Sequence, residues 1–171
     1  MKTLVILFIT GIILNACNPQ KLTPEQTAVE NDRIKTRIET FLTTYANKDM
    51  NTLVRMLSTS KDFHFLGSDV SEINKNKAEF QNQIDQDWKL FDTVHFGEIR
   101  NLSIRISDCG DLAATVFDAP MTVSVKGNQS KFFFRMSSTF VKENGLWQLV
   151  QGLGSIPSVG ESSVELIQKL K

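Results

Sequence analysis

The feature that most constrains the fold is a change of hydrophobic period at Asp92. Before this residue, apolar side chains recur about every three to four positions, as on one face of an α-helix. After it, apolar and polar residues alternate, as in half-buried β-strands, between the turn sequences SDCGD, KGNQ and ENG. Helices followed by an antiparallel meander predict an α+β fold, with a curved, mainly antiparallel sheet around a helical layer. The predicted strands are Thr93–Ile106, Leu112–Val125, Lys131–Lys142 and Leu146–Leu153.

Three helices are predicted ahead of this meander. The first begins at Thr23, because Thr23 can cap the helix, Pro24 fits the first turn and Gln26 can close a capping box. Asp49 and Asn76 are suitable caps for the second and third helices. A short strand, DFHFLG, is expected between these two helices. The apolar face of the third helix is expected to bury Phe80, Ile84, Trp88 and Phe91.

The first seventeen residues are predicted to be an export signal. Lys2 supplies its charge, and the apolar run 4–14 is much shorter than the ~20 residues that span a bilayer. The sequence LNAC resembles a bacterial lipoprotein processing box, with cleavage before Cys17 and lipid attached to it; an ordinary signal peptide cut nearby is the alternative. A cell-envelope location follows, facing the periplasm if the host has an outer membrane. The predicted organisation is a signal at 1–17, a tether at 18–24, a domain at 25–157 and a C-terminal tail at 158–171.

The composition points away from several classes of function. The chain has 19 basic and 19 acidic residues, spread along its length, so it lacks the basic footprint of a nucleic-acid-binding protein. Cys109 is the only cysteine besides Cys17, so acylation of Cys17 would leave no internal disulfide. The cysteines and histidines do not have the spacing of a metal site. We therefore expect no nucleic acid, no metal and no other cofactor.

Four segments, in this order and spacing, carry a resemblance to a known family. They are YANKDMNTLVRML, GSDVSE, RMSSTFVKENGLW and the closing Ser155-Ile156-Pro157. Through them, the range Ile34–Pro157 resembles the SnoaL-like branch of the nuclear transport factor 2-like superfamily. The resemblance implies a cone-shaped fold with a pocket between the helices and the sheet. That fold serves isomerases, hydrolases, cyclases, binding proteins and oligomerisation modules, so it does not by itself decide the function.

The resemblance also implies that known catalytic groups are missing. SnoaL-like members commonly carry a histidine where this sequence has Leu153, which can neither donate nor accept a proton. In the steroid isomerases of the superfamily, the tyrosine, the aspartate base and the protonated aspartic acid correspond to Phe41, Gly67 and Ser138 here. None of these three residues can do that chemistry. The sequence is therefore not expected to be a steroid isomerase of that kind.

The last strands predict which polar residues share a face of the sheet. A four-residue GNQS loop would pair Val123 with Phe134 and put Asp118 and Arg135 together on the face away from the apolar core. A three-residue ENG turn would place Gln151 opposite Ser137. Family members carry the matching arginine in or near the pocket, which favours Arg135 as a ligand contact; an exposed or interface face is the alternative. The candidate pocket residues are Phe41, Tyr45, Trp88, Asp118, Arg135, Ser137 and Gln151.

Other polar residues fit ordinary structural roles better. His64 and His95 are predicted strand residues, and Cys109 lies in a predicted turn. Glu72 is a less favoured ligand contact in a segment that fits a cap. Ser155 is not a candidate nucleophile, because no histidine–acid pair accompanies it.

Three functions remain open at this point. The favoured one is a lipid-anchored domain that binds a small, partly apolar molecule without catalysis. The second is an isomerase or hydrolase that uses Asp118 as acid or base and Arg135 to hold an anionic or carbonyl group. The third is an oligomerisation or partner-docking module. The expected partners are a small molecule, the membrane through the lipid anchor and, in the third case, a second copy of the chain.

Overall fold

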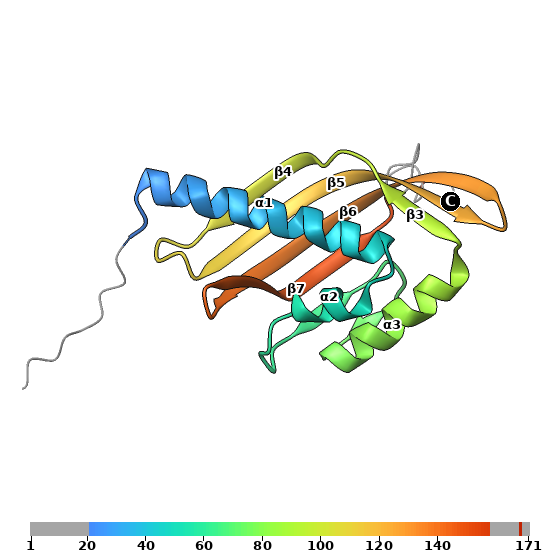
Figure 1. The fold of residues 1–171 in the computed structure, drawn as a ribbon, viewed down its shortest axis with the longest axis horizontal. Helices are drawn as coiled ribbons and strands as arrows, with labels where there is room; N and C mark the ends of the chain where they lie inside the picture. The colour runs from blue at the N-terminus through green and yellow to red at the C-terminus, as the bar shows by residue number, and fades with distance from the viewer. Residues whose placement is uncertain (1–20, 158–167, 169–171) are drawn as a thin grey trace, which may run out of the picture.

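The computed structural model describes residues 21–157 and residue 168. The long helix α1 lies across one face of a curved sheet, and α2 and α3 lie below it (Figure 1). The predicted α+β fold is confirmed. The predicted signal, Cys17 and most of the predicted tether and C-terminal tail lie outside the described residues. The elements are α1 (Pro24–Ala46), α2 (Met50–Arg55), β1 (His64–Leu66), β2 (Ile73–Asn74), α3 (Lys77–Leu90), β3 (Thr93–Phe96), β4 (Arg100–Ile106), β5 (Leu112–Val125), β6 (Asn128–Glu143) and β7 (Leu146–Ser155).

The three helices begin where the sequence predicts. The Thr23 side chain accepts a hydrogen bond from the Gln26 amide, and the Gln26 side chain accepts one from the Thr23 amide, which completes a capping box. The side chains of Asp49 and Asn76 cap α2 and α3 in the same way, each accepting a backbone N–H three residues further on. No helix within residues 21–157 is long and apolar enough to cross a membrane.

Within the described range 21–157, the sheet has seven strands and is almost entirely antiparallel. Its order is β2-β1-β7-β6-β5-β3, and β4 pairs with the other half of the same edge of β5. Among the strands within residues 21–157, β1 and β7 pair in parallel, and β1 comes from the helical half of the chain. The three long strands β5, β6 and β7 therefore form the curved centre of the sheet, and the shorter strands form its edges (Figure 1).

The β5–β6 hairpin has a tighter turn than predicted. Lys126 and Gly127 form the turn, both with positive φ (50° and 79°), between the paired residues Val125 and Asn128. Val123 consequently pairs with Ser130, four residues before the predicted partner. An even shift keeps every side chain on its predicted face, because side chains alternate with a period of two.

The β6–β7 hairpin also differs from the prediction in its register. Its turn is the two-residue Asn144–Gly145, with φ of 51° and 78°, and not a three-residue ENG loop. A bulge at Val150 then adds one residue to β7, so that Gln151 pairs with Thr139 and not with Ser137. The shorter turn and the bulge together change the register by two, so Gln151 stays on its predicted face.

The predicted strand Thr93–Ile106 is broken in the middle. Its two parts, β3 and β4, pair with different halves of β5, and the break lies beside Pro120. Pro120 accepts a hydrogen bond from the Gly97 amide at 2.7 Å but has no N–H to donate to a continuous strand. Asn101 then takes a positive φ of 53° within the irregular start of β4. The break between β3 and β4 therefore coincides with Pro120 on the neighbouring strand.

The core lies between the helical layer and the inner face of the sheet. On α3, Phe80 and Ile84 are buried as predicted, whereas Trp88 and Phe91 are only partly buried. These two rings lie at the end of α3, where the core gives way to a cavity. The most deeply buried apolar side chains include Ile34, Ile38, Leu53, Leu57, Phe80, Phe117, Met136 and Leu149.

Candidate functional site

A cavity of about 260 Å³ lies between the helical layer and the sheet. It is larger than the cavity of about 150 Å³ that accommodates benzene. Residues of α1, α3, the loop between β1 and β2, and strands β1, β3, β5, β6 and β7 contribute to its wall. Seven of the lining residues are aromatic: Phe41, Tyr45, Phe65, Phe80, Phe91, Phe96 and Phe134.

Tyr45 is the centre of the aromatic wall. Its ring centroid lies 6.0 Å from that of Trp88, 6.1 Å from that of Phe91 and 6.0 Å from that of Phe96. Phe96 in turn lies 5.6 Å from Phe134 on β6. Edge-on and tilted ring pairs of this kind are favourable beyond the area they bury. The rings hold one another in place, so the cavity has a preformed apolar surface.

Three ionisable groups gather at one side of this surface: Tyr45, Glu72 and Asp87. Burial raises the pKa of the Tyr45 hydroxyl above its usual range, and the charges of Asp87 and Glu72 add to this effect. Burial also raises the pKa of Asp87. The hydrogen bond from Gln83 lowers this pKa by less than burial raises it, and the charge of Glu72 raises it further. The two carboxyl groups therefore interact with each other and with the tyrosine.

Glu72 is positioned by the loop between β1 and β2. Its carboxylate folds back over Gly67, where a Cβ atom would lie 2.0 Å from Glu72 Oε2 and 2.7 Å from Glu72 Cβ, so a larger residue would displace the Glu72 side chain. The Asp69 amide donates to Glu72 Oε2 at 3.0 Å. The Gln83 side chain donates to both acids, to Asp87 Oδ1 at 2.9 Å and to Glu72 Oε1 at 3.4 Å. Gln83 thus bridges the two carboxyl groups.

The structure separates the seven candidate pocket residues into three places. Phe41 and Tyr45 line the cavity. Trp88 contacts Tyr45 from outside the lining, and its buried indole N–H finds no acceptor among the described residues. Ser137 and Gln151 lie on the outer face of the sheet, in a shallow groove with Leu153 and His64. Asp118 and Arg135 also lie on the outer face, outside the cavity.

Asp118 and Arg135 face each other directly across β5 and β6. Arg135 Nε donates to Asp118 Oδ1 at 2.7 Å and its terminal nitrogen donates to Oδ2 at 3.3 Å, while Asn101 Nδ2 donates to Oδ2 at 2.8 Å. The hydrogen bonds from Arg135 and Asn101 lower the pKa of Asp118.

This pair corrects the predicted grouping of Asp118 and Arg135 with Phe41 and Tyr45 in one pocket. The side-chain assignment to the outer face was right, but the cavity lies behind the inner face. Strand alternation fixes which residues share a face, and it does not indicate which face a cavity adjoins. Asp118 and Arg135 therefore do not line the cavity between the helices and the sheet.

Asp87 was missed by the sequence analysis, although the sequence contains a signal for it. Phe80, Ile84, Asp87 and Phe91 recur at spacings of four, three and four, which places the carboxyl group on the apolar stripe of α3. An acidic residue on an apolar stripe is a candidate for a function or for a buried pair. Glu72 was considered only as a less favoured contact, and the structure places it in the cavity wall.

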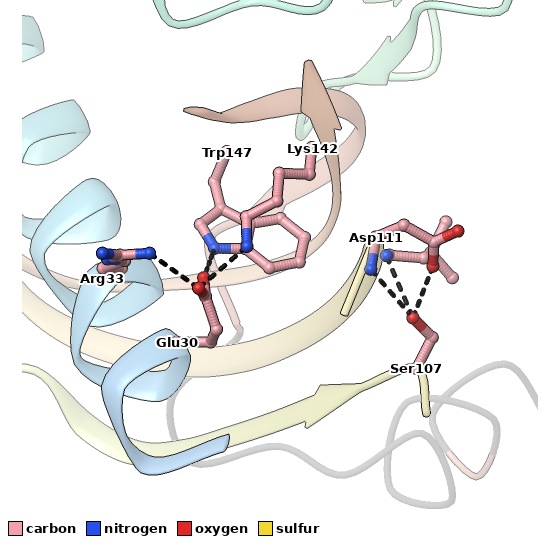
Figure 2. Close-up of polar contacts among 7 residues, drawn as sticks. Glu30, Arg33, Ser107, Asp111, Lys142 and Trp147 are labelled. Atoms are coloured by element: carbon pink, nitrogen blue, oxygen red, sulfur yellow. Dashed lines mark hydrogen bonds and ion pairs between the residues drawn. The ribbon is translucent and has the colours of Figure 1, made fainter. Parts of the chain in front are cut away.

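The remaining polar residues behave mostly as structural ones. His64 and His95 are exposed strand residues. Cys109 lies in the turn before β5, where its thiol approaches Asp111 at 3.1 Å. The Ser107 hydroxyl also donates to Asp111, at 2.6 Å (Figure 2). Ser155 contributes to the cavity wall. Within residues 21–157 no three or more His, Cys, Asp and Glu side chains are grouped so that they could hold a metal ion.

A helical layer on a curved open sheet, with a cavity between the two, defines the cone-shaped α+β class of pocket domains. Residues 34–158 match the sequence model of the SnoaL-like domain, and the chain belongs to this family. The SnoaL-like branch predicted from the four sequence segments, within the nuclear transport factor 2-like superfamily, is thereby confirmed. No curated protein matches the chain.

Solved structures support the same fold. A proposed scytalone dehydratase from Novosphingobium aromaticivorans superposes with a TM-score of 0.71 at 10% identity, over 82% of this chain and 100% of that one. A nuclear transport factor 2-like superfamily protein from Salmonella enterica gives 0.67 at 21% identity, over 80% and 99%. The type 2 hexachlorocyclohexane dehydrochlorinase LinA gives 0.66 at 10%, over 77% and 88%. At these identities the likeness shows the fold alone.

Proposed function

We propose that this SnoaL-like domain binds a small, mostly apolar molecule in its cavity and does so without catalysis. The observation that carries the proposal is the aromatic wall around a space of about 260 Å³. Pockets for small molecules are typically apolar and aromatic with a few placed polar groups. The side of the cavity that carries Tyr45, Glu72 and Asp87 supplies such groups.

Residues at the positions of the family's catalytic groups support binding without catalysis. Phe41 and Gly67, which stand where steroid isomerases carry a tyrosine and an aspartate base, both line the cavity and cannot transfer a proton. Leu153, which stands where the family commonly carries a histidine, is apolar and lies on the outer face of the sheet. Binding needs none of these groups.

Native mass spectrometry of the domain purified from its own host tests the proposal. We expect a bound small molecule whose mass disappears on denaturation. Val123→Phe, which adds bulk to the cavity wall, should reduce the occupancy. Val116→Phe is the matched control, because it makes the same change on the outer face of the same strand. Arg135→Met on the outer face should also leave the occupancy unchanged. An empty parent protein, or equal loss in Val116→Phe, would contradict the proposal.

We further propose that the domain is held at a membrane of the cell envelope by a lipid on Cys17. The apolar run and the LNAC sequence support this part, and lipid on a cysteine gives stable anchoring when more than one chain is attached. Cys17→Ser in the full chain should move the protein from the membrane fraction to the soluble fraction without changing its melting temperature. Continued membrane association in high salt would argue against the anchor.

Self-association is a second candidate function, favoured by the outer face of the sheet. Four large apolar side chains on this face are 43–46% exposed: Leu112, Val116, Phe133 and Leu153. Exposed apolar patches of this kind are typical of interaction surfaces. Light scattering of the parent and of Val116→Lys would decide the matter, because a dimer through this face should dissociate in the variant.

A further inference from the structure

All charged side chains in the described part of the cavity wall are acidic. Glu72 and Asp87 line the cavity, and no lysine, arginine or histidine among residues 21–157 does so. Lys48 belongs to the turn after α1, and its ammonium group donates to the carbonyl oxygens of Trp88 and Phe91 at 2.6 and 2.7 Å. The cavity is therefore apolar and negatively charged at the same time.

The two carboxyl groups are poorly compensated by the residues that the structure describes. Their hydrogen bonds come from neutral groups, chiefly the Gln83 amide that bridges them. Burial and the charge of Glu72 raise the pKa of Asp87, which means that the cavity disfavours a second negative charge. Partly buried carboxylates without a cation are costly, and a positively charged ligand would remove that cost.

The aromatic wall favours the same kind of ligand. The faces of aromatic rings attract ammonium groups within about 6 Å of the ring centroid. One ring of this wall already does so inside the chain, because the Lys48 ammonium lies 4.7 Å from the centroid of Phe91. Phe91 and Phe96 pack against Tyr45 at 6.1 and 6.0 Å, and the Tyr45 hydroxyl is close enough to Asp87 and Glu72 for their charges to raise its pKa.

An anionic ligand meets the opposite conditions in this cavity. It would be repelled by Glu72 and Asp87, and no basic side chain in the described wall could pair with it. Arg135, the residue predicted to hold an anion, is on the outer face and is engaged by Asp118. A neutral ligand would leave the two carboxyl groups as they are.

We propose that the cavity is selective for small organic cations, namely amines or quaternary ammonium compounds with an apolar body. The apolar body would lie against the phenylalanine wall, and the ammonium group would lie between Glu72, Asp87 and the ring of Tyr45. This inference rests on the proposed function, because it names the class of molecule that the same cavity binds.

The test compares three probes with the same body and different head groups: 3-phenylpropylammonium, 3-phenylpropanol and 3-phenylpropanoate. Calorimetric titration of the domain near neutral pH should show the ammonium probe binding at least tenfold more tightly than the alcohol, and the carboxylate most weakly. Equal binding of alcohol and ammonium would overturn the selectivity while leaving the proposed function intact. If none of the three binds, the inference is overturned, and the native mass spectrum of the host-purified domain decides the proposed function separately.

Two variants locate the selectivity. Glu72→Gln and Asp87→Asn keep the size of each side chain and should each weaken binding of the ammonium probe about tenfold while changing binding of the alcohol little. Asp118→Asn is the matched control on the outer face and should change neither affinity. Melting temperatures show whether each variant is folded. An unchanged ammonium affinity in the folded Glu72→Gln, Asp87→Asn double variant would overturn the assignment of these two carboxyl groups.

Discussion

The Trp147 indole donates a hydrogen bond of 2.7 Å to the Glu30 carboxylate, and this contact joins α1 to the β6–β7 hairpin (Figure 2). Glu30 is buried, and its other oxygen lies 2.8 Å from Lys142 Nζ and 2.7 Å from an Arg33 guanidinium nitrogen. Lys142 also lies 5.0 Å from the centroid of the Trp147 ring. The cluster contacts the first half of α1, whereas the cavity contacts Tyr45 near its end. Stability and ligand binding are therefore open to separate tests.

Trp147→Phe should destabilise the domain by about 1–3 kcal/mol, because it leaves a buried carboxylate without one of its donors. Trp88→Phe is the matched control, since the buried indole N–H of Trp88 has no acceptor among the described residues. Both substitutions remove a similar volume, so the difference between them reports the hydrogen bond. Urea unfolding of the two variants measures it. Equal destabilisation would show that the Glu30 contact adds nothing.

The Glu30 cluster also predicts how stability depends on pH. Burial alone would raise the pKa of Glu30, but the hydrogen bonds from Lys142 and Trp147 and the charges of Lys142 and Arg33 together lower it. A carboxyl group with a lowered pKa in the folded state contributes fully above its ordinary pKa of about 4.3, and this contribution is lost as the pH falls through the folded pKa.

Glu30→Gln should therefore be clearly less stable than the parent near pH 7, and the difference between the two proteins should be smaller near pH 3. Urea midpoints of both proteins at the two pH values give the comparison. The parent should still weaken in acid, because Asp118 and Glu143 also have lowered pKa values through their hydrogen bonds with Arg135 and Ser58. A constant difference between parent and variant across this range would show that the Glu30 charge does not contribute.

Asp87→Asn is expected to have the opposite effect and to stabilise the domain at neutral pH. The pKa of Asp87 is raised in the folded state by burial and by the charge of Glu72. Stability is therefore lost as the pH rises from the unfolded pKa to the folded pKa of this group, and the ionised group destabilises the domain above both. Asparagine can still accept the hydrogen bond from Gln83. Calorimetry at pH 7 should show a melting temperature about 1–3 °C higher, the shift that several tenths of a kcal/mol produce in a domain of this size. A lower melting temperature would contradict the cost assigned to this carboxyl group.

Local sequence signals predicted the elements well and the cavity poorly. The caps at Thr23, Asp49 and Asn76 depend on residues at most four positions apart, and all three are present. The faces of β5 and β6 were also correct, because alternation is local. The predicted strand partners on β5 and β6 were shifted, because the turn lies at Lys126 and Gly127. A positive φ at a lysine is not predictable from its residue type.

The cavity depends on which face of the sheet the helices cover, and this is decided by packing far along the chain. The sequence predicts both Arg135 and Tyr45 as pocket residues, but of these two only Tyr45 lines the cavity on the helical side of the sheet. Asp87 was detectable in principle, as an acid on an apolar helical stripe. The pairing of Asp87 with Glu72 was not detectable, because Glu72 reaches the cavity through a loop whose course the sequence did not predict.

The glycines near the end of β7 have a structural explanation that leads to the last prediction. A Cβ atom on Gly152 would lie 2.6 Å from Phe65 Cε2, a distance too short for any real contact. A Cβ atom on Gly154 would lie 3.2 Å from Phe134 Cε2, which is tight but tolerable with a small movement of the ring. The two glycines let aromatic side chains of the cavity wall approach the strand closely.

Gly152→Ala should therefore destabilise the domain by about 1–3 kcal/mol, as overpacking does, because Phe65 also packs against Phe80 and cannot move freely. Gly154→Ala should cost less, since Phe134 is only partly buried and has more room to shift. In a Phe65→Leu background, Gly152→Ala should destabilise the domain less than in the parent. Urea unfolding of the double-mutant cycle measures this coupling. If the two substitutions are additive, the contact between Gly152 and the Phe65 ring does not explain the glycine.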